Sequence, residues 1–135
     1  MNSMRSIRLI LTIAALALVT ACTTAPAGSG AAGSGAINVQ DEIASTAKGL
    51  DDALAAYKAG DAAKADQLAG DAYLDHFELV EGPLGKVDIA FMQQLEDQIS
   101  AGVRNAMKDG KPVADVEALV TKAKADLATA ATKLK

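Results

Sequence analysis

The sequence predicts an all-helical fold, an up-down-up-down four-helix bundle over residues 37–135. Apolar residues recur at steps of three and four along four segments of about 20 residues, which is the period of one face of an α-helix. Short joins rich in Gly, Pro and Asp separate the segments, and no stretch shows the sustained apolar–polar alternation of a strand. Consecutive helices with short joins pack as antiparallel neighbours, which gives the bundle.

The first two helices are expected over residues 37–58 and from Ala62 to about residue 81. Gly60 favours a helix end, and Asp61 can cap the second helix. Gly82-Pro83 is expected to end that helix, because proline disfavours helical backbone in the residue before it. The predicted inward stripes are Val39, Ile43, Ala47, Leu50, Leu54 and Tyr57, then Ala65, Leu68, Ala69, Ala72, Tyr73, His76, Leu79 and Val80.

The other two helices are expected from a cap at Asp88 to about Lys108, and over residues 113–134 after Gly110 and Pro112. Alanine fills much of every stripe, so the helices can approach closely while burying little area per residue, and modest stability is expected. The inward residues are predicted to be Phe91, Met92, Leu95, Ile99, Val103 and Ala106, then Val116, Leu119, Val120, Ala123, Leu127, Ala130 and Leu134.

The N-terminus has the pattern of a secretory signal. Arg5 and Arg8 are the only charges before residue 41, and an apolar run over residues 9–20 follows them. A helix over that run would be roughly 18 Å long, short of the roughly 30 Å hydrocarbon core of a bilayer, so a spanning anchor is not expected.

The last residues of this signal and the residue after it, Val19-Thr20-Ala21-Cys22, resemble the lipobox of bacterial lipoproteins. The resemblance implies removal of residues 1–21 and attachment of diacylglycerol to Cys22, with fatty acyl chains as the membrane anchor. Thr23 stands where an Asp would resemble an inner-membrane retention signal, so the periplasmic face of the outer membrane is expected in a Gram-negative cell. The alternative is an ordinary signal followed by an unrelated cysteine. With a single Cys, neither an internal disulfide nor a thiolate cluster can form.

Residues 22–36 are predicted to be the lipidated Cys and a flexible linker, because Gly, Ser, Ala and Pro dominate and no charge is present. Residues 1–21 hold two of the 13 Lys and Arg and no acid. Their removal leaves 11 basic against 17 acidic side chains and takes the net charge from −4 to −6. That balance argues against nucleic acid as a partner, because its binding requires Lys and Arg on phosphates.

Candidate site chemistry is concentrated over residues 73–81 of the second helix. Asp75, Glu78 and Glu81 follow at steps of three, so neighbouring carboxylates can share a face, as hard cations such as iron require. Glu96 of the third helix is a further candidate ligand. The alternative is that the acids only face solvent and that His76 is a core residue. The Glu-x-x-His order of a di-iron bundle is absent, so a ferritin-like oxidase is not expected.

The segment AYLDHFELVEGPL, residues 72–84, resembles part of the extracytoplasmic helical region of bacterial Ftr-type high-affinity iron permeases. In that family the pattern Ala-Tyr-Leu-Asp-x-Phe-Glu-x-x-Glu is followed by a Leu and an Asp, which correspond to Leu84 and Asp88. The resemblance covers roughly residues 50–119. Five residues of this chain match the motif: Tyr73, Asp75, Phe77, Glu78 and Glu81. His76 falls on a variable position of the pattern.

This chain lacks the multiple membrane helices and the Arg-Glu-x-x-Glu motifs of those permeases, so it is not a permease by itself. The resemblance implies a free-standing, lipid-tethered accessory domain that binds iron or docks on a permease or another envelope protein. Tyr73 and Phe77 have helix packing as their alternative role.

A helical interaction or structural lipoprotein of the cell envelope, with no metal, is the second functional expectation. An enzyme is not expected, because no nucleophile–base pair and no phosphate-binding Gly loop are present and no catalytic residue can be named.

Overall fold

The computed structural model describes residues 37–135, so the predicted signal peptide, lipid site Cys22 and linker lie outside the described residues. The described part is all-helical and contains no strand. Its elements are α1 (Val39–Lys58), α2 (Ala62–Asp71), the π-helical η1 (Ala72–Phe77), α3 (Glu78–Val87), α4 (Ile89–Glu96), the π-helical η2 (Asp97–Val103), α5 (Arg104–Lys108) and α6 (Val113–Lys133).

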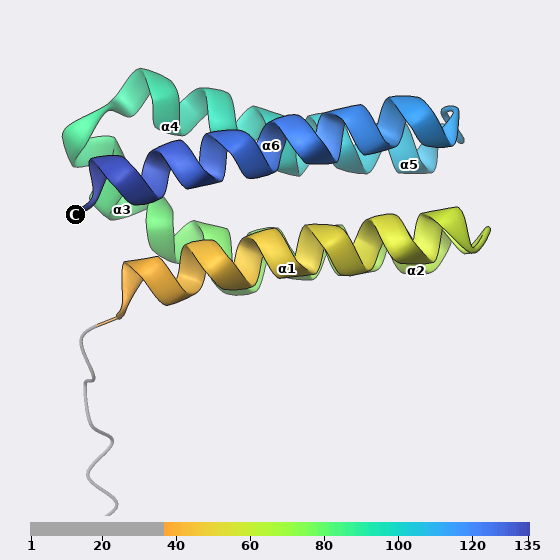
Figure 1. Cartoon of the computed structure of the whole chain (residues 1–135), viewed down its shortest axis with the longest axis horizontal. Coiled ribbons are helices and arrows are strands. Elements are labelled where there is room, and N and C mark those ends of the chain that lie inside the picture. Colours follow the sequence, from red (N-terminus) through yellow and green to blue (C-terminus); the bar gives the residue numbers. More distant parts are fainter. Residues whose placement is uncertain (1–36) are drawn as a thin grey trace, which may run out of the picture. The chain divides into compact units, whose positions relative to one another are not determined.

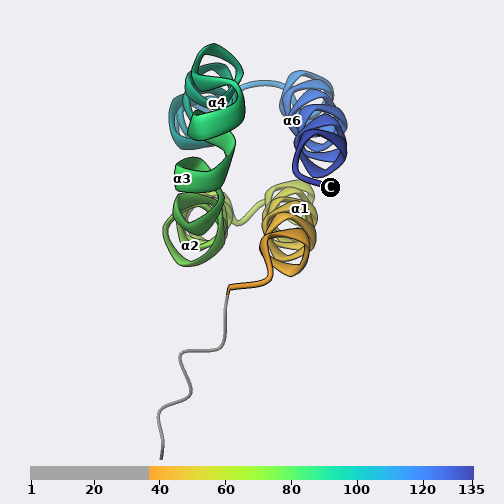
Figure 2. The same cartoon turned by 90° about the vertical axis from the view of Figure 1, so that its left-hand side faces the viewer.

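These elements form four long segments, because η1 joins α2 to α3 and η2 joins α4 to α5 without a break (Figure 1). Helix α1 packs against α2, η1 and α6, while α2 packs against α5, and α6 against η2. Figure 2 shows the four segments around a common centre, with α3 leading from the level of α2 to that of α4. None of the helices between residues 37 and 135 combines the length and apolarity that crossing a bilayer requires.

The helix ends lie at the capping and glycine residues that the sequence predicts. The carboxylates of Asp61 and Asp88 cap α2 and α4, accepting from the backbone N–H of Lys64 at 2.9 Å and of Phe91 at 3.1 Å. Gly60 and Gly110 have φ values of 87° and 65°, a left-handed conformation that ends a helix at little cost only in glycine. Both predicted caps and both glycine stops are confirmed.

The predicted end of the second helix at Gly82-Pro83 is wrong, because α3 continues through Pro83 to Val87. A proline clashes with the Cβ of the residue before it, and Gly82 has no Cβ, so helical backbone remains accessible there. The helix ends instead at Asp88, whose φ of −156° leaves the helical region while its side chain caps α4.

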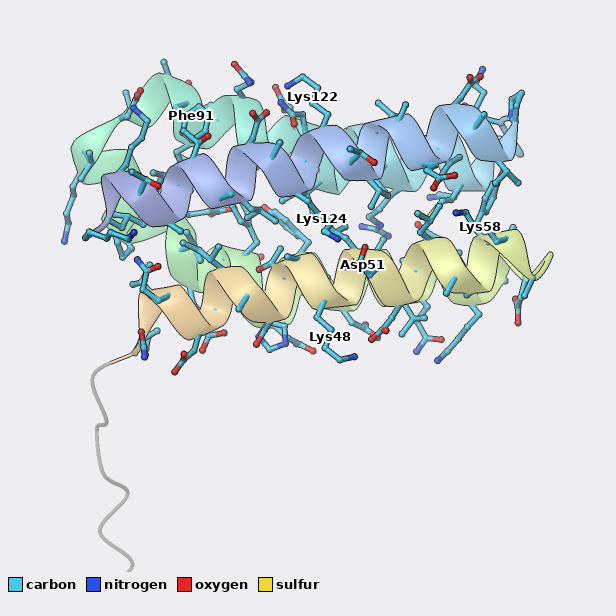
Figure 3. All side chains as sticks on the ribbon, in the orientation of Figure 1. Lys48, Asp51, Lys58, Phe91, Lys122 and Lys124 are labelled. Carbon is cyan, nitrogen blue, oxygen red and sulfur yellow. The ribbon has the colours of Figure 1, made fainter. Side chains whose placement is uncertain are left out.

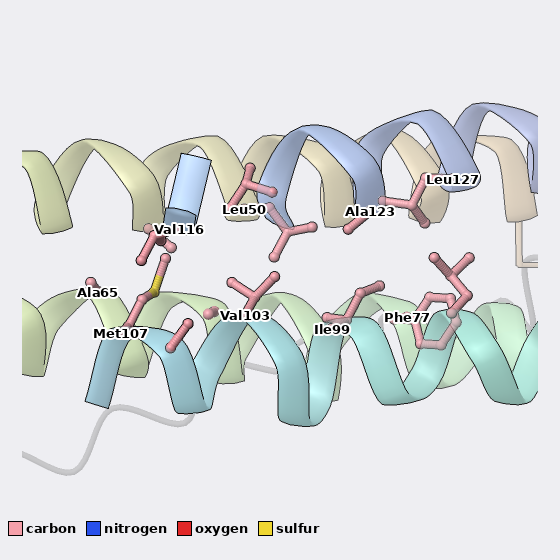
Figure 4. Packing of buried hydrophobic residues seen from close by; sticks show 14 of the residues in the cluster. Leu50, Ala65, Phe77, Ile99, Val103, Met107, Val116, Ala123 and Leu127 are labelled. Carbon is pink, nitrogen blue, oxygen red and sulfur yellow. The ribbon is translucent and has the colours of Figure 1, made fainter. Parts of the chain in front are cut away.

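All four segments contribute to one apolar core, which Figure 4 shows between α1, α6 and the facing segments. Many of its members are alanines that exclude water completely, among them Ala53, Ala65 and Ala123. The Cβ that a side chain at Gly49 would carry lies 2.6 Å from the Cβ of Ala72, so α1 and η1 pack at a distance that only glycine permits.

The core register of the second segment differs from the prediction after Ala72. The sequence placed Tyr73, His76, Leu79 and Val80 inward. Val80 is fully buried as predicted and Tyr73 packs against the core, but His76 and Leu79 are 39% and 37% exposed, and Phe77 is fully buried instead. A π-helix bonds residue i to i+5 and so inserts one residue per turn relative to an α-helix. η1 therefore shifts every later side chain round the helix by one position.

The other three predicted stripes hold in their centres. Ile43, Leu50 and Tyr57 of α1 and most of the α6 stripe are buried, whereas Leu119 and Leu134 lie only partly buried at the edge of the core. Thr46 was not predicted to face inward. It is fully buried because its hydroxyl donates to the Glu42 carbonyl oxygen at 2.8 Å within the same helix.

Polar contacts connect the segments at the surface. The Tyr57 hydroxyl donates to the Lys111 carbonyl oxygen at 2.6 Å and so joins α1 to the turn before α6. Lys124 of α6 points toward Asp51 of α1, with Nζ 2.7 Å from Oδ1 (Figure 3). Exposed ion pairs of this kind contribute about 0–1 kcal/mol each, so the apolar core holds the segments together.

Candidate functional site

The candidate segment over residues 73–81 begins in η1 and continues into α3. The π-helix distributes its side chains around the helix differently from an α-helix. Phe77 is fully buried, Tyr73 and Glu81 are partly buried, and Asp75 and Glu78 are exposed. Tyr73 packs on Phe77 with ring centroids 6.0 Å apart and a tilt of 33°. Phe77 therefore has the packing role given above as an alternative.

Tyr73 and Glu81 are brought together across two turns. The phenol hydroxyl lies near enough to the Glu81 carboxylate for each group to affect the pKa of the other, although the two residues are eight positions apart. Two turns along a regular α-helix, the residue on the same face as residue i is i+7. The extra residue that η1 inserts makes it i+8. Sequence periodicity alone could not find this pair.

Glu81 lies in an environment that disfavours its negative charge. Burial raises the pKa of its carboxyl, and the charges of Glu96 and Glu78 raise the pKa further, while the interaction with Tyr73 opposes them. Burial also raises the pKa of the Tyr73 hydroxyl, with Glu81, Glu96 and Glu78 adding to the rise. The Oε1 atom of Glu81 is buried and accepts no hydrogen bond from residues 37–135. One carboxylate thus has an unsatisfied oxygen beside two further acids.

Of the four predicted metal ligands, Glu78 and Glu96 lie near enough to Glu81 for their charges to raise the pKa of its carboxyl. Asp75 is separate from them. It lines a cavity of about 210 Å³ on the α1 side of the helix, with His76, Asp71, Asp52, Lys48, Ser45, Leu68, Gly49 and Ala72. Nowhere in residues 37–135 do three or more His, Cys, Asp or Glu side chains converge as ligands of a metal ion would.

His76 is not the core residue that the α-helical register predicted. Its side chain is 39% exposed, and Nδ1 lies 2.8 Å from Oε2 of Glu42 in α1. An ionised carboxylate only accepts, so this contact requires the proton on Nδ1. The π-helix is the cause, because it places Phe77 at the inward position that His76 would occupy in a regular helix.

An apolar groove of about 750 Å³ lies between η2–α5 and α6. Small residues make up much of its wall, and charged side chains surround it; its residues are Ala101, Gly102, Asn105, Ala106, Asp109, Lys111, Asp115, Ala118, Leu119 and Lys122. The helical periodicity of the sequence does not reveal this groove. The only sequence signal is the small size of Ala101, Gly102 and Ala118, which helical periodicity alone assigns to ordinary helix surface.

We expect Glu81→Gln to stabilise the protein at neutral pH. The raised pKa means that the fold disfavours ionised Glu81, whose ordinary pKa is 4.5. This penalty is absent below about pH 4.5, where folded and unfolded chains both hold the proton; it grows as the pH rises above that value and is complete above the folded-state pKa. Glutamine retains an acceptor for Tyr73 without the charge. Urea unfolding should show a gain at about pH 7 that vanishes near pH 4, and a gain independent of pH would contradict the raised pKa.

Comparison with known proteins gives no relative on which to base a function. No protein-family model, no curated protein and no solved structure matches this chain.

Proposed function

We propose that the chain is a lipid-anchored extracytoplasmic accessory of iron uptake that binds iron weakly and is not an enzyme. The observation that carries the metal-binding part is Glu81, a partly buried carboxylate with one buried oxygen that accepts no hydrogen bond within residues 37–135 and with a pKa raised by the charges of Glu96 and Glu78. A cation would offset the mutual repulsion of these acids and satisfy the free oxygen.

The proposed ligands are Glu81 first, then Glu78 and Glu96, with the Tyr73 hydroxyl as a further oxygen. Carboxylate oxygens suit a hard cation such as iron. Asp75, one of the three acids that the sequence pattern selected, is left out because it lines the cavity on the α1 side. The side chains are not gathered into a preformed site, so Glu78, which is exposed, has to move toward the metal. The site is therefore open and weak, as transfer rather than storage of iron requires.

Isothermal titration with ferrous and ferric iron, in a non-chelating buffer, tests this proposal. The protein is the chain from residue 22 onward with Cys22→Ser, which cannot be lipidated. We expect the Glu78→Gln/Glu81→Gln variant to lose binding, because two of three carboxylates are removed without a change of shape. Asp75→Asn is the matched control, since it removes one acid of the same segment and should bind as the parent does. Binding that survives in the double variant, or is lost only with Asp75, would place the site elsewhere.

The envelope location is the second part of the proposal. The lipobox-like exit before Cys22 supports lipid attachment there, and residues 1–21 and 22–36 serve as signal and linker. We further propose that residues 37–135 form an up-down-up-down four-helix bundle. The short joins support this arrangement, as do the contacts of α1 with α2 and of α6 with α1.

Cys22→Ser is expected to abolish acylation while the helical domain remains folded. The sulfur of Cys22 is the only thiol that can receive the lipid, and the linker separates it from α1. Cells grown with a labelled fatty-acid analogue should label the parent protein and not the variant. Circular dichroism of both proteins provides the check on folding. Equal labelling of the two would remove the lipid anchor from the proposal.

A docking module without metal is the second candidate function, and the groove between η2–α5 and α6 favours it. About 750 Å³ of apolar space with a charged rim is suited to a side chain or helix of an envelope protein, such as an iron permease. The iron titration separates the two candidates. No binding by the parent protein would leave docking as the function.

A further inference from the structure

We propose that the end of the domain formed by the start of α1, the α3–α4 turn and the end of α6 lies directly on the lipid surface, with Val87 and Ile89 in contact with lipid. This inference rests on the lipid anchor proposed above. It adds an orientation: one end of the helices faces the membrane, and the opposite end, with the turns at Gly60 and Gly110, faces away.

Exposed apolar side chains gather at this end. Ile89 is 61%, Val87 57% and Ile37 54% exposed, and apart from Leu74 no other large apolar side chain of residues 37–135 is as exposed. Val87 and Ile89 flank Asp88, which caps α4, so the turn presents both of them to the outside at once. Water-exposed apolar side chains on a rigid turn mark a contact surface more clearly than isolated ones do.

Three contacts place these residues at one end of the domain. The Gln40 side-chain amide donates to the Ala131 carbonyl oxygen at 3.1 Å, which holds the start of α1 against the end of α6. Lys133 Nζ lies 3.0 Å from Asp88 Oδ2 and 5.4 Å from the centre of the Phe91 ring, which holds the end of α6 against the α3–α4 turn. Figure 1 shows the same grouping, with the C-terminus, α3 and the start of α1 at the same end of the helices.

The anchor enters the domain at this end. The chain from Cys22 must reach Ile37 through residues 23–36, and the flexible linker that their Gly/Ser/Ala composition predicts would have a root-mean-square reach of roughly 20 Å. Helix α6 alone, at 21 residues, is roughly 30 Å long, so the opposite end lies much farther from the point of attachment than the tethered end does. The tether therefore supplies a higher effective concentration of lipid to this end than to the opposite end, and a weak apolar contact suffices to orient the domain.

Lipid fits this surface better than a second copy of the chain does. Three side chains are too few for a stable protein interface, which buries about 800 Å² on each partner. The charges at this end are mixed, since Asp41 and Glu42 oppose the exposed Lys86 and Lys135. The contact is therefore apolar rather than electrostatic, and it should not require anionic lipid.

The test uses the full lipidated protein in phosphatidylcholine vesicles. The acylated Cys22 leaves no free thiol, so a single new cysteine, Ile89→Cys or Val113→Cys, can carry an environment-sensitive fluorophore. Val113 is the matched control, because it is an exposed apolar residue, 42% accessible, at the start of α6 and hence at the opposite end. With a quencher attached to the lipid, we expect at least threefold stronger quenching at position 89 than at position 113, in neutral and anionic vesicles alike.

Failure of the proposed orientation can be distinguished from failure of the lipid anchor. The anchor is supported if the protein floats with the vesicles and the Cys22→Ser variant does not. If the anchor is present, equal quenching at positions 89 and 113 would overturn the orientation alone. Quenching that appears only with anionic lipid would overturn the apolar contact. Fluorophore signals at position 89 that change with protein density, and not with the lipid quencher, would assign the surface to a second copy. Flotation that does not depend on Cys22 would overturn both proposals.

Discussion

Replacing Phe77 with alanine is expected to destabilise the domain by about 3–5 kcal/mol, the usual cost of emptying a large buried aromatic site. Phe77 is fully buried and is the largest such side chain in the core. Typical domains are stable by about 5–15 kcal/mol, and this core is rich in alanine, so the variant should be close to unfolding at room temperature. Urea unfolding followed by circular dichroism measures the loss.

His76→Ala is the matched control for this prediction. In a regular α-helix His76 would face the core in place of Phe77, so its substitution would then be the more costly of the two. The histidine side chain is 39% exposed and loses only its contact with Glu42, so a cost of about 1 kcal/mol or less is expected. If His76→Ala proved more costly than Phe77→Ala, the π-helix η1 would be wrong, and the inward stripe would return to the predicted register.

Leu95→Ala is expected to cost about 2–5 kcal/mol. Leu95 lies in α4, excludes water completely and belongs to the core. Truncating it leaves a cavity that neighbouring helices cannot fill without moving.

Leu119→Ala provides the comparison, since the sequence predicts both leucines in the centres of their stripes. Leu119 is only partly buried and lines the apolar groove, so much of the space left by truncation opens to solvent, and a cost of about 1 kcal/mol is expected. Denaturant melts of the two variants should therefore differ clearly. Equal losses would show that Leu119 belongs to the core and that the groove is closed in solution.

The sequence alone determined the all-helical fold, the four segments and most of their boundaries. Each of these depends on near neighbours in the chain, which is why it could be read from residue order. Asp61 and Asp88 cap the helices that follow them through a backbone N–H three positions on, and Gly60 and Gly110 stop helices through their own φ angles. The stripe of α6 is buried along its centre because one period holds over the whole helix.

Only the tertiary structure decided where the regular helical spacing of the buried residues is interrupted. Regular helical spacing puts His76 inward, but burying Phe77 gains more from the hydrophobic effect than burying a polar imidazole. The close packing of Gly49 on Ala72 fixes α1 against the start of η1, and the chain accommodates Phe77 by adding a residue to the turn. That extra residue brings Tyr73 to Glu81, separates Asp75 from the other acids and moves His76 to Glu42. A local pattern cannot predict such a shift, because its cause is the shape of the helix on the other side of the core.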